Sequence, residues 1–202
     1  MFTKISDMDT PSIYHTLVNG VVPRPIAWVS TIDQQGVSNL APYSFFGVAS
    51  VNPPVLTITT VPARDKLEKD TLKNLRETGD CVIHVVTEEL AEVMNLSCAN
   101  YEAGVSEIDA LSLQTVNSEL VTAPSLKQVP VRFECKLRDT VEISAQPAGG
   151  VLILLDVVGV YMADSVSAEN KLNPAALNIL GKLGGNDYSN TAVTLQMARP
   201  EN

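Results

Sequence analysis

The chain is short of the residues that usually carry metal or nucleophilic chemistry. Its 202 residues include three cysteines, Cys81, Cys98 and Cys135, which are odd in number, far apart and without CxxC spacing. This pattern disfavours a disulfide framework and a zinc ribbon. Each cysteine lies among apolar neighbours, so we expect all three to be small buried side chains in a cytoplasmic protein.

Histidine is equally scarce, with only His15 and His84 in the chain. Neither HExxH nor GxSxG nor a carboxylate cluster accompanies them, so we expect no metal site and find little support for a Ser-His-Asp triad. A structural or surface role is the better interpretation of both histidines. The chain also lacks GxGxxG and the P-loop motif, which leaves no sequence evidence for a Rossmann or P-loop phosphate site.

Positive charge is in deficit, because 14 Lys and Arg face 23 Asp and Glu, for a net charge of −9. Such a surface repels phosphate backbones, so nucleic acid is not an expected partner. The longest apolar stretch, residues 151–162, is interrupted by Asp156 and is too short to span a bilayer. The N-terminus has no apolar run typical of a secretory signal. An anionic ligand would therefore need a local cluster of donors in a pocket.

The composition is that of a folded domain. Apolar residues make up 45% of the chain, charged residues 18%, and the mean hydropathy is +0.12. These values exclude an intrinsically disordered chain, and the length predicts a single domain over residues 1–202.

Strand patterns outnumber helix patterns along the chain. The expected strands cover residues 25–32, 37–46, 55–60, 81–86, 131–137, 140–145 and 151–162, with a turn at 138–139 between the fifth and sixth. The expected helices cover residues 64–78, 87–99 and 106–110, and Gly79 is placed to end the first of them. Since the helices do not alternate with the strands, the pattern predicts a mainly β protein, an antiparallel β-barrel with inserted helices.

Two segments carry polar residues in places suited to a ligand. Ser30, Thr31, Asn39 and Ser44 recur at the ends of the apolar strands of the first hairpin, where Pro42 predicts either the end of a strand or a sheet edge. These side chains either cap loose backbone groups or face a planar polar ligand.

The second segment, Lys69-Asp70-Thr71, adjoins the basic residues Arg64 and Lys66. It is either an ordinary solvated helix face or a place where a lysine and a hydroxyl meet a phosphate. The residues alone leave both alternatives open for each segment.

The longer motif around these residues resembles a known family. The run R-P-I-A-W-V-S-T-x-D-x-x-G-x-S-N-L-A-P-Y-S-F-F from Arg24, followed by N-P-P and K-D-T-x-x-N-L, resembles the flavin reductase-like family, the FMN-binding split β-barrel proteins that include flavoredoxin. Weaker likenesses follow in order at 124–127, 133–137, 151–160 and 180–185 with Tyr188. Two places depart from the family pattern: Lys182 stands where an arginine is usual, and the segment 101–113 differs.

The resemblance implies a homodimeric six-stranded split barrel with one FMN per subunit near the dimer interface. It implies reduction of FMN by NADH or NADPH, with reduced flavin passed to a separate monooxygenase. Two alternatives stay open: an electron carrier like flavoredoxin without its own nicotinamide activity, and a barrel that has lost its cofactor. Because the flavin carries the hydride chemistry, no catalytic side chain is expected.

The resemblance also assigns roles to residues of this chain. Ser30 and Thr31 would touch the isoalloxazine edge or the ribityl chain, and Asn39, Leu40 and Ala41 would line the ring, largely by main chain. Backbone N–H groups near the ring would stabilise its reduced form. Ser44, Lys69 and Thr71 would hold the phosphate. Arg24 matches the family's arginine without a defined role, and we expect Trp28 to belong to the barrel core.

Overall fold

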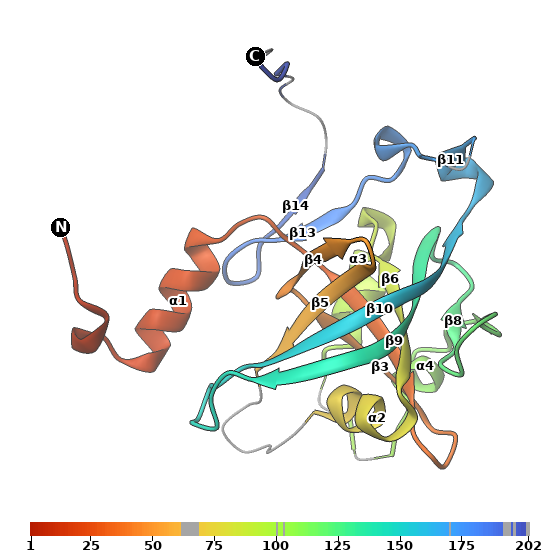
Figure 1. Ribbon diagram of the computed structural model, residues 1–202, viewed down its shortest axis with the longest axis horizontal. Helices are drawn as coiled ribbons and strands as arrows, with labels where there is room; N and C mark the ends of the chain where they lie inside the picture. Colours follow the sequence, from red (N-terminus) through yellow and green to blue (C-terminus); the bar gives the residue numbers. More distant parts are fainter. Residues whose placement is uncertain are drawn as a thin grey trace.

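The computed structural model describes residues 1–61, 69–99, 101–102, 104–169, 171–191, 195 and 197–200 (Figure 1). The helices are α1 Thr10–Gly20, α2 Asp70–Thr78, α3 Ala91–Leu96 and α4 Glu107–Ala110, with short 3-10 turns η1 Ile5–Asp7, η2 Glu88–Leu90, η3 Asp164–Val166 and η4 Pro174–Ala176. The strands are β1 Arg24–Pro25, β2 Ala27–Ile32, β3 Ser38–Tyr43, β4 Phe46–Val51, β5 Pro54–Thr60, β6 Asp80–Val85, β7 Thr115–Val116, β8 Ser125–Leu126, β9 Val131–Glu142, β10 Val151–Met162, β11 Ser167–Ala168, β12 Lys171–Leu172, β13 Leu180–Lys182 and β14 Tyr188–Asn190.

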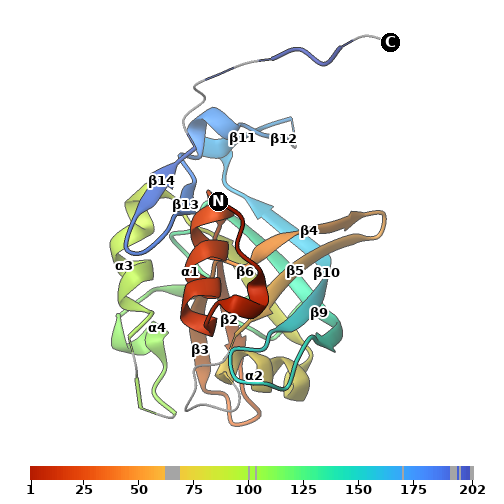
Figure 2. The same cartoon turned by 90° about the vertical axis from the view of Figure 1, so that its left-hand side faces the viewer.

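The main sheet has the order β3-β2-β6-β9-β10-β5-β4, and all its neighbours pair antiparallel. It is a split β-barrel with helices inserted between strands, as the sequence predicted. It has seven strands, one more than the six that the resemblance implied. Figures 1 and 2 show α2 at one end of the barrel and α1 beside it. Strand β3 forms one edge of the sheet, which confirms the edge position expected from Pro42.

Strand β2 has side chains buried on both faces. Ala27 and Val29 belong to the cluster inside the barrel, whereas Trp28 belongs to a second cluster between the hairpin, α3 and α4. This arrangement explains why β2 shows no simple alternation of apolar and polar residues: side chains on both of its faces are buried, and these include the polar Ser30 and Thr31. Trp28 is fully buried, as expected of a core residue, and its Nε1 donates to Ser97 Oγ over 2.9 Å.

Several predicted element boundaries differ from those of the structure, and the expected strand 37–46 is divided between β3 and the start of β4. The expected turn at 138–139 is absent, because β9 runs unbroken past it. Leu154 pairs with Asp139 and Leu155 pairs with Leu137, so Arg138 is the extra residue of a β-bulge that accommodates the polar doublet within one strand. The expected helix 87–99 is divided into η2 and α3 and ends at Leu96.

The helix expected over 64–78 begins at Asp70, because Lys69 has an extended backbone. Residues 62–68, which include Arg64 and Lys66, lie outside the described residues. The predicted end is confirmed: Gly79 follows α2 with φ of 82°, a left-handed conformation that glycine adopts without strain.

The cysteines and histidines differ in their surroundings. Cys81 and Cys135 are buried as expected, but Cys98 is exposed, because it follows the last turn of α3 rather than lying on a buried strand. His15 is exposed on α1, and His84 is fully buried on β6. The surface and structural interpretations of these two histidines are therefore confirmed.

Two side-chain hydrogen bonds tie α2 to the first hairpin. Asn74 Nδ2 donates to Thr31 Oγ1 over 3.0 Å, and Asn39 Nδ2 donates to Thr71 Oγ1 over 2.9 Å. Asn74, Thr31 and Thr71 are all buried. These bonds fix the N-terminus of α2 relative to β3.

We predict that Asn74→Ala lowers the free energy of unfolding by about 1–3 kcal/mol, because it removes a buried hydrogen-bond donor and leaves a gap. Urea denaturation measures the change. Lys73→Ala replaces the exposed neighbour of Asn74 on the same helix and should change stability by about 0.5 kcal/mol or less. Equal effects of the two substitutions would contradict a stabilising role for the Asn74–Thr31 bond.

Candidate functional site

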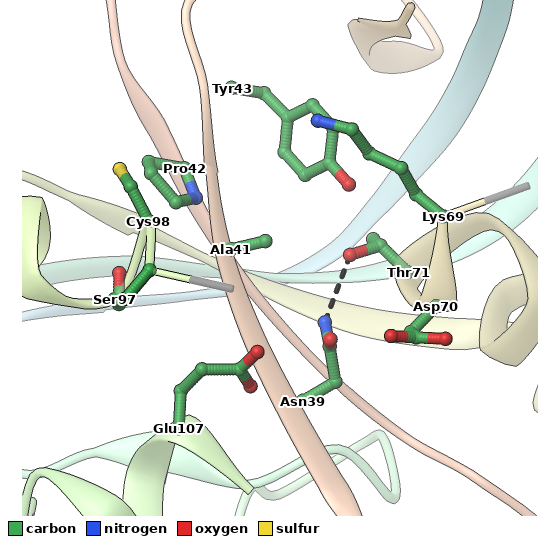
Figure 3. Close-up of a pocket in the computed structure, with 11 residues that line it drawn as sticks. Asn39, Ala41, Pro42, Tyr43, Lys69, Asp70, Thr71, Ser97, Cys98 and Glu107 are labelled. Atoms are coloured by element: carbon green, nitrogen blue, oxygen red, sulfur yellow. Dashed lines mark hydrogen bonds between the residues drawn. The ribbon is translucent and has the colours of Figure 1, made fainter. Parts of the chain in front are cut away.

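A cavity of about 300 Å³ lies between the edge strand β3, the start of α2, the residues that follow α3, and α4 (Figure 3). It is the larger of the two cavities that the predicted site residues line, and we call it the main cavity. Its lining residues are Asn39, Ala41, Pro42, Tyr43, Lys69, Asp70, Thr71, Ser97, Cys98, Ala99 and Glu107.

A smaller cavity of about 190 Å³ adjoins it and is called the side cavity. Pro42, Tyr43 and Lys69 line both cavities. The side cavity is lined in addition by Tyr14, Ser44, Phe45, Thr59 and Val61. The two together have the size of a small-molecule site.

The start of α2 gives the site a positive end. Lys69 precedes the helix, and Asp70 and Thr71 form its first turn on the cavity wall. Backbone N–H groups at a helix N-terminus and a lysine together favour an anion. The Lys69 Nζ lies 5.2 Å from the centre of the Tyr43 ring. Of the segments that line the site, this one is best suited to a phosphate.

The edge of β3 mainly offers hydrogen-bond acceptors. Leu40 N–H points away from β2 and donates to Glu107 Oε2 over 2.8 Å. Pro42, two residues on and therefore directed to the same edge, has no N–H. The carbonyl oxygens of both residues point to this edge, because N–H and C=O of one residue lie on the same side of a strand. The expectation that N–H groups of this segment serve a bound ring is therefore not met at Leu40.

Tyr43 and Cys98 add polar groups that stay uncharged near neutral pH. The Tyr43 hydroxyl is buried and has no hydrogen-bond partner among the described residues. Burial raises the pKa of Tyr43, and the negative charges of Asp70 and Glu107 act in the same direction. Partial desolvation by its surroundings on the cavity wall also raises the pKa of the exposed Cys98, against the opposing effect of the Lys69 and Lys182 charges.

Four of the nine residues predicted to bind a cofactor meet in the main cavity: Asn39, Ala41, Lys69 and Thr71. Ser44 lines the side cavity, next to Lys69.

The other predicted residues lie in the interior of the protein. Ser30 Oγ donates to the Pro124 carbonyl over 2.6 Å, Thr31 Oγ1 accepts from Asn74, and the Leu40 side chain is fully buried in the second core cluster. Within the described part of the chain, none of Ser30, Thr31 and Leu40 lines either cavity.

Arg24 is buried beneath the side cavity. Its guanidinium donates to the carbonyls of Val18, Val21 and Leu183, the last two over 2.8 and 2.9 Å, and its Nε lies 3.5 Å from Ser44 Oγ. Arg24 therefore joins the end of α1 to the segment after β13 and contacts two residues of the side cavity, Ser44 and Phe45, with its guanidinium carbon 6.0 Å from the centre of the Phe45 ring.

Sequence reasoning missed Glu107 and Cys98 on the cavity wall. Glu107 begins a helix of four residues and contacts Leu40 of β3, which is 67 residues earlier in the chain. Such a long-range contact produces no hydrophobic periodicity in the sequence. Cys98 was expected to be buried like the other two cysteines, but its place after the end of α3 turns it outward.

The residues present fit a phosphorylated flavin. A lysine, a helix start and two hydroxyls gather where a phosphate is expected, and edge carbonyls and an amide border the remaining space. The described residues contain no group of three or more His, Cys, Asp or Glu that could hold a metal ion. In the same ranges, no helix has the length and apolar character needed to cross a membrane.

Comparisons with known proteins agree with this chemistry. Residues 19–179 match the family described as "Flavin reductase like domain". The protein BH2278 of Halalkalibacterium halodurans is 36% identical over 190 residues, which cover 93% of this chain and 90% of the relative.

Two solved structures are similar over almost the whole chain. Nitrilotriacetate monooxygenase component B from Bacillus cereus has a TM-score of 0.92 and 25% identity, covering 98% of each chain. The 2-nitrobenzoate 2-nitroreductase NbaA from Pseudomonas fluorescens has a TM-score of 0.89 and 27% identity, covering 99% of this chain and 96% of its own. The family implies a flavin cofactor and oxidoreductase activity. The chain therefore belongs to the family of proteins with a flavin reductase like domain.

Proposed function

We propose that the protein is an NAD(P)H-dependent FMN reductase. The observation that carries the proposal is the position of Lys69, at the start of α2 and at the junction of the two cavities, opposite the edge of β3. When bound, the flavin supplies the acceptor for a hydride, that is, two electrons and one proton from the nicotinamide, which leaves in its oxidised form.

The residues of the chain bind and orient the cofactor in this proposal. Lys69, Thr71 and Ser44 hold the phosphate. These residues form a single phosphate site, and FMN is proposed because it carries a single phosphate. Asn39 and Ala41 border the ring, and Asn39 is itself held in place by its bond to Thr71. Ser30, Thr31, Leu40 and Arg24 support these residues from behind. No side chain acts as a catalytic residue.

We propose a homodimer as the working assembly. Exposed apolar side chains support it: Tyr14 and Leu17 on α1 are each 56% exposed and Val21 after it is 61% exposed, beside the side cavity that Tyr14 lines. A separate monooxygenase is the proposed acceptor of reduced flavin, supported by the likeness to a monooxygenase component.

Anaerobic oxidation of NADH and of NADPH with stoichiometric FMN tests the activity. We expect the protein to accelerate oxidation of one dinucleotide well above the rate with free FMN. If FMN binds but neither dinucleotide reduces it faster than free flavin, the reductase proposal is wrong and the alternative of an electron carrier is favoured. If FMN does not bind, the alternative of a barrel without cofactor is favoured.

The proposed phosphate site makes a second prediction. Ser44→Ala and Thr71→Ala should each weaken FMN binding about tenfold or more, because a hydrogen bond to a charged group typically contributes about 1.5–3 kcal/mol. Riboflavin has no phosphate, so Ser44→Ala should leave its binding nearly unchanged, and Thr71→Ala should weaken it less than it weakens FMN, through loss of the Asn39–Thr71 bond only. Quenching of flavin fluorescence measures both dissociation constants.

Thr78→Ala is the matched control, since Thr78 ends the same helix, its hydroxyl donates to the Asn74 carbonyl over 2.8 Å, and among the described residues it lines neither cavity. It should leave both dissociation constants close to those of the unchanged protein. Equal weakening of FMN and riboflavin by Ser44→Ala and Thr71→Ala would place these hydroxyls away from the phosphate.

A further inference from the structure

A single carboxylate, that of Glu107, is fixed against the strand edge that borders the main cavity. The helix α4 is attached to β3 at two points: Ser106 Oγ lies 2.7 Å from Ser38 Oγ, and Glu107 Oε2 accepts from Leu40 N–H over 2.8 Å. Figure 3 shows the carboxylate directed toward the cavity. The two contacts therefore fix the position of this negative charge, whereas the charge of a side chain without such contacts would move with the side chain.

Glu107 and Lys69 lie at different ends of the main cavity, well separated in Figure 3. With a phosphate at Lys69 and the start of α2, the space left for the ring is bordered by β3, by Ser97 and Cys98, and by Glu107. The other carboxylate on the wall, Asp70, is adjacent to Lys69 in sequence and belongs to the phosphate end. Of the described acidic residues that line the main cavity, Glu107 is therefore the one that borders the space left for the ring.

We propose that Glu107 makes the bound flavin a stronger reductant by disfavouring negative charge on the reduced ring. Uptake of a hydride by the ring adds two electrons and one proton, so the ring gains one negative charge unless a second proton follows. A carboxylate nearby raises the free energy of that charged form. Among the described residues, the part of this edge that borders the main cavity also offers no N–H to offset that charge, because Leu40 N–H is bonded to Glu107 and Pro42 has no N–H.

This inference rests on the proposed function only in requiring that a flavin occupy the main cavity. In this inference Glu107 acts on the flavin only through the charge of its carboxylate and takes no part in the hydride transfer. Its consequence is a lower midpoint potential for the bound FMN, measurable without any nicotinamide.

The test is the midpoint potential of bound FMN at pH 7, measured against redox dyes, for the unchanged protein and for Glu107→Gln. The glutamine keeps an oxygen that can accept from Leu40 N–H while the charge is removed. We expect the equilibrium constant for reduction to rise roughly tenfold, which is about 30 mV for a two-electron couple. Asp109→Asn makes the same charge change on an exposed position of α4 and should leave the potential unchanged.

An unchanged or lower potential in Glu107→Gln would overturn the inference, and so would equal rises in the two variants. Loss of FMN binding in Glu107→Gln alone would also overturn it, because the carboxylate would then serve binding and not potential. If the unchanged protein itself fails to bind FMN, the proposed function fails instead. Glu107→Asp, which retains the charge, should stay closer to the unchanged protein than Glu107→Gln.

Discussion

The free energy of unfolding should fall steeply between pH 7 and pH 4 because His84 is held neutral in the folded protein. Its Nδ1 lies 2.9 Å from the Trp28 carbonyl, and its Nε2 accepts from Leu126 N–H over 2.9 Å. These contacts require a proton on Nδ1 and none on Nε2. A second proton would face the Leu126 N–H and break that bond.

Burial lowers the pKa of His84 to about 3, and the nearby charge of Arg132 acts in the same direction. In the unfolded chain the pKa of a histidine is about 6.5. Between these values only the unfolded state takes up the proton, so the stabilisation is complete above about pH 6.5 and is lost as the pH falls toward 3. We expect a loss from this residue of roughly 2 kcal/mol by pH 5 and roughly 3 kcal/mol by pH 4.

Urea denaturation of His84→Gln at several pH values separates this contribution from that of the carboxylates. The variant should be less stable at pH 7, but its free energy of unfolding should fall less between pH 7 and pH 4. The number of protons taken up on unfolding, given by the slope against pH, should be smaller by nearly one. His15→Gln, at the exposed histidine of α1, should retain the slope of the unchanged protein. A slope that is the same in all three proteins would show that His84 does not set the pH dependence.

Arg24→Lys should lower the free energy of unfolding by about 2–3 kcal/mol despite the retained charge. The guanidinium donates to three backbone carbonyls from two distant parts of the chain, those of Val18, Val21 and Leu183. A lysine ammonium cannot reproduce this planar arrangement, so buried carbonyls lose their partners. Thermal and urea unfolding would measure the loss.

Arg138→Lys is the matched control, because Arg138 forms an ion pair with Asp156 at the surface, with Nη2 and Oδ1 2.7 Å apart. We expect it to cost at most about 1 kcal/mol. If Arg24→Lys is as mild as Arg138→Lys, Arg24 does not hold the end of α1 in place. Weaker FMN binding with unchanged stability would instead assign Arg24 a direct role at the cofactor.

The barrel was predictable because its strands leave strong local signals. The run from Ala27 to Val29 is apolar without alternation since β2 is buried on both faces, and Pro42 marks the free edge of β3. Errors arose where tertiary contacts override local signals. The Arg138-Asp139 pair has the composition of a turn, but the pairing of β9 with β10 absorbs it as a bulge.

The site was only partly predictable for a related reason. Asn39, Lys69 and Thr71 belong to two motifs that α2 and β3 bring together through the Asn39–Thr71 bond. The hydroxyls of Ser30 and Thr31 occur in the same motif, yet their strand directs them to partners within the protein. Glu107 reaches the cavity through a contact with Leu40, which no local pattern could indicate.

Hydrogen–deuterium exchange with and without FMN tests most directly whether the main cavity holds the flavin. We expect slower exchange in residues 39–43, 69–72, 97–99 and 105–110 when FMN is added. Residues 87–90 and 176–178, which line a separate cavity of about 530 Å³ on another part of the surface, should not change. Protection at that second cavity, with none around Lys69 and β3 while FMN is shown to be bound, would contradict the account.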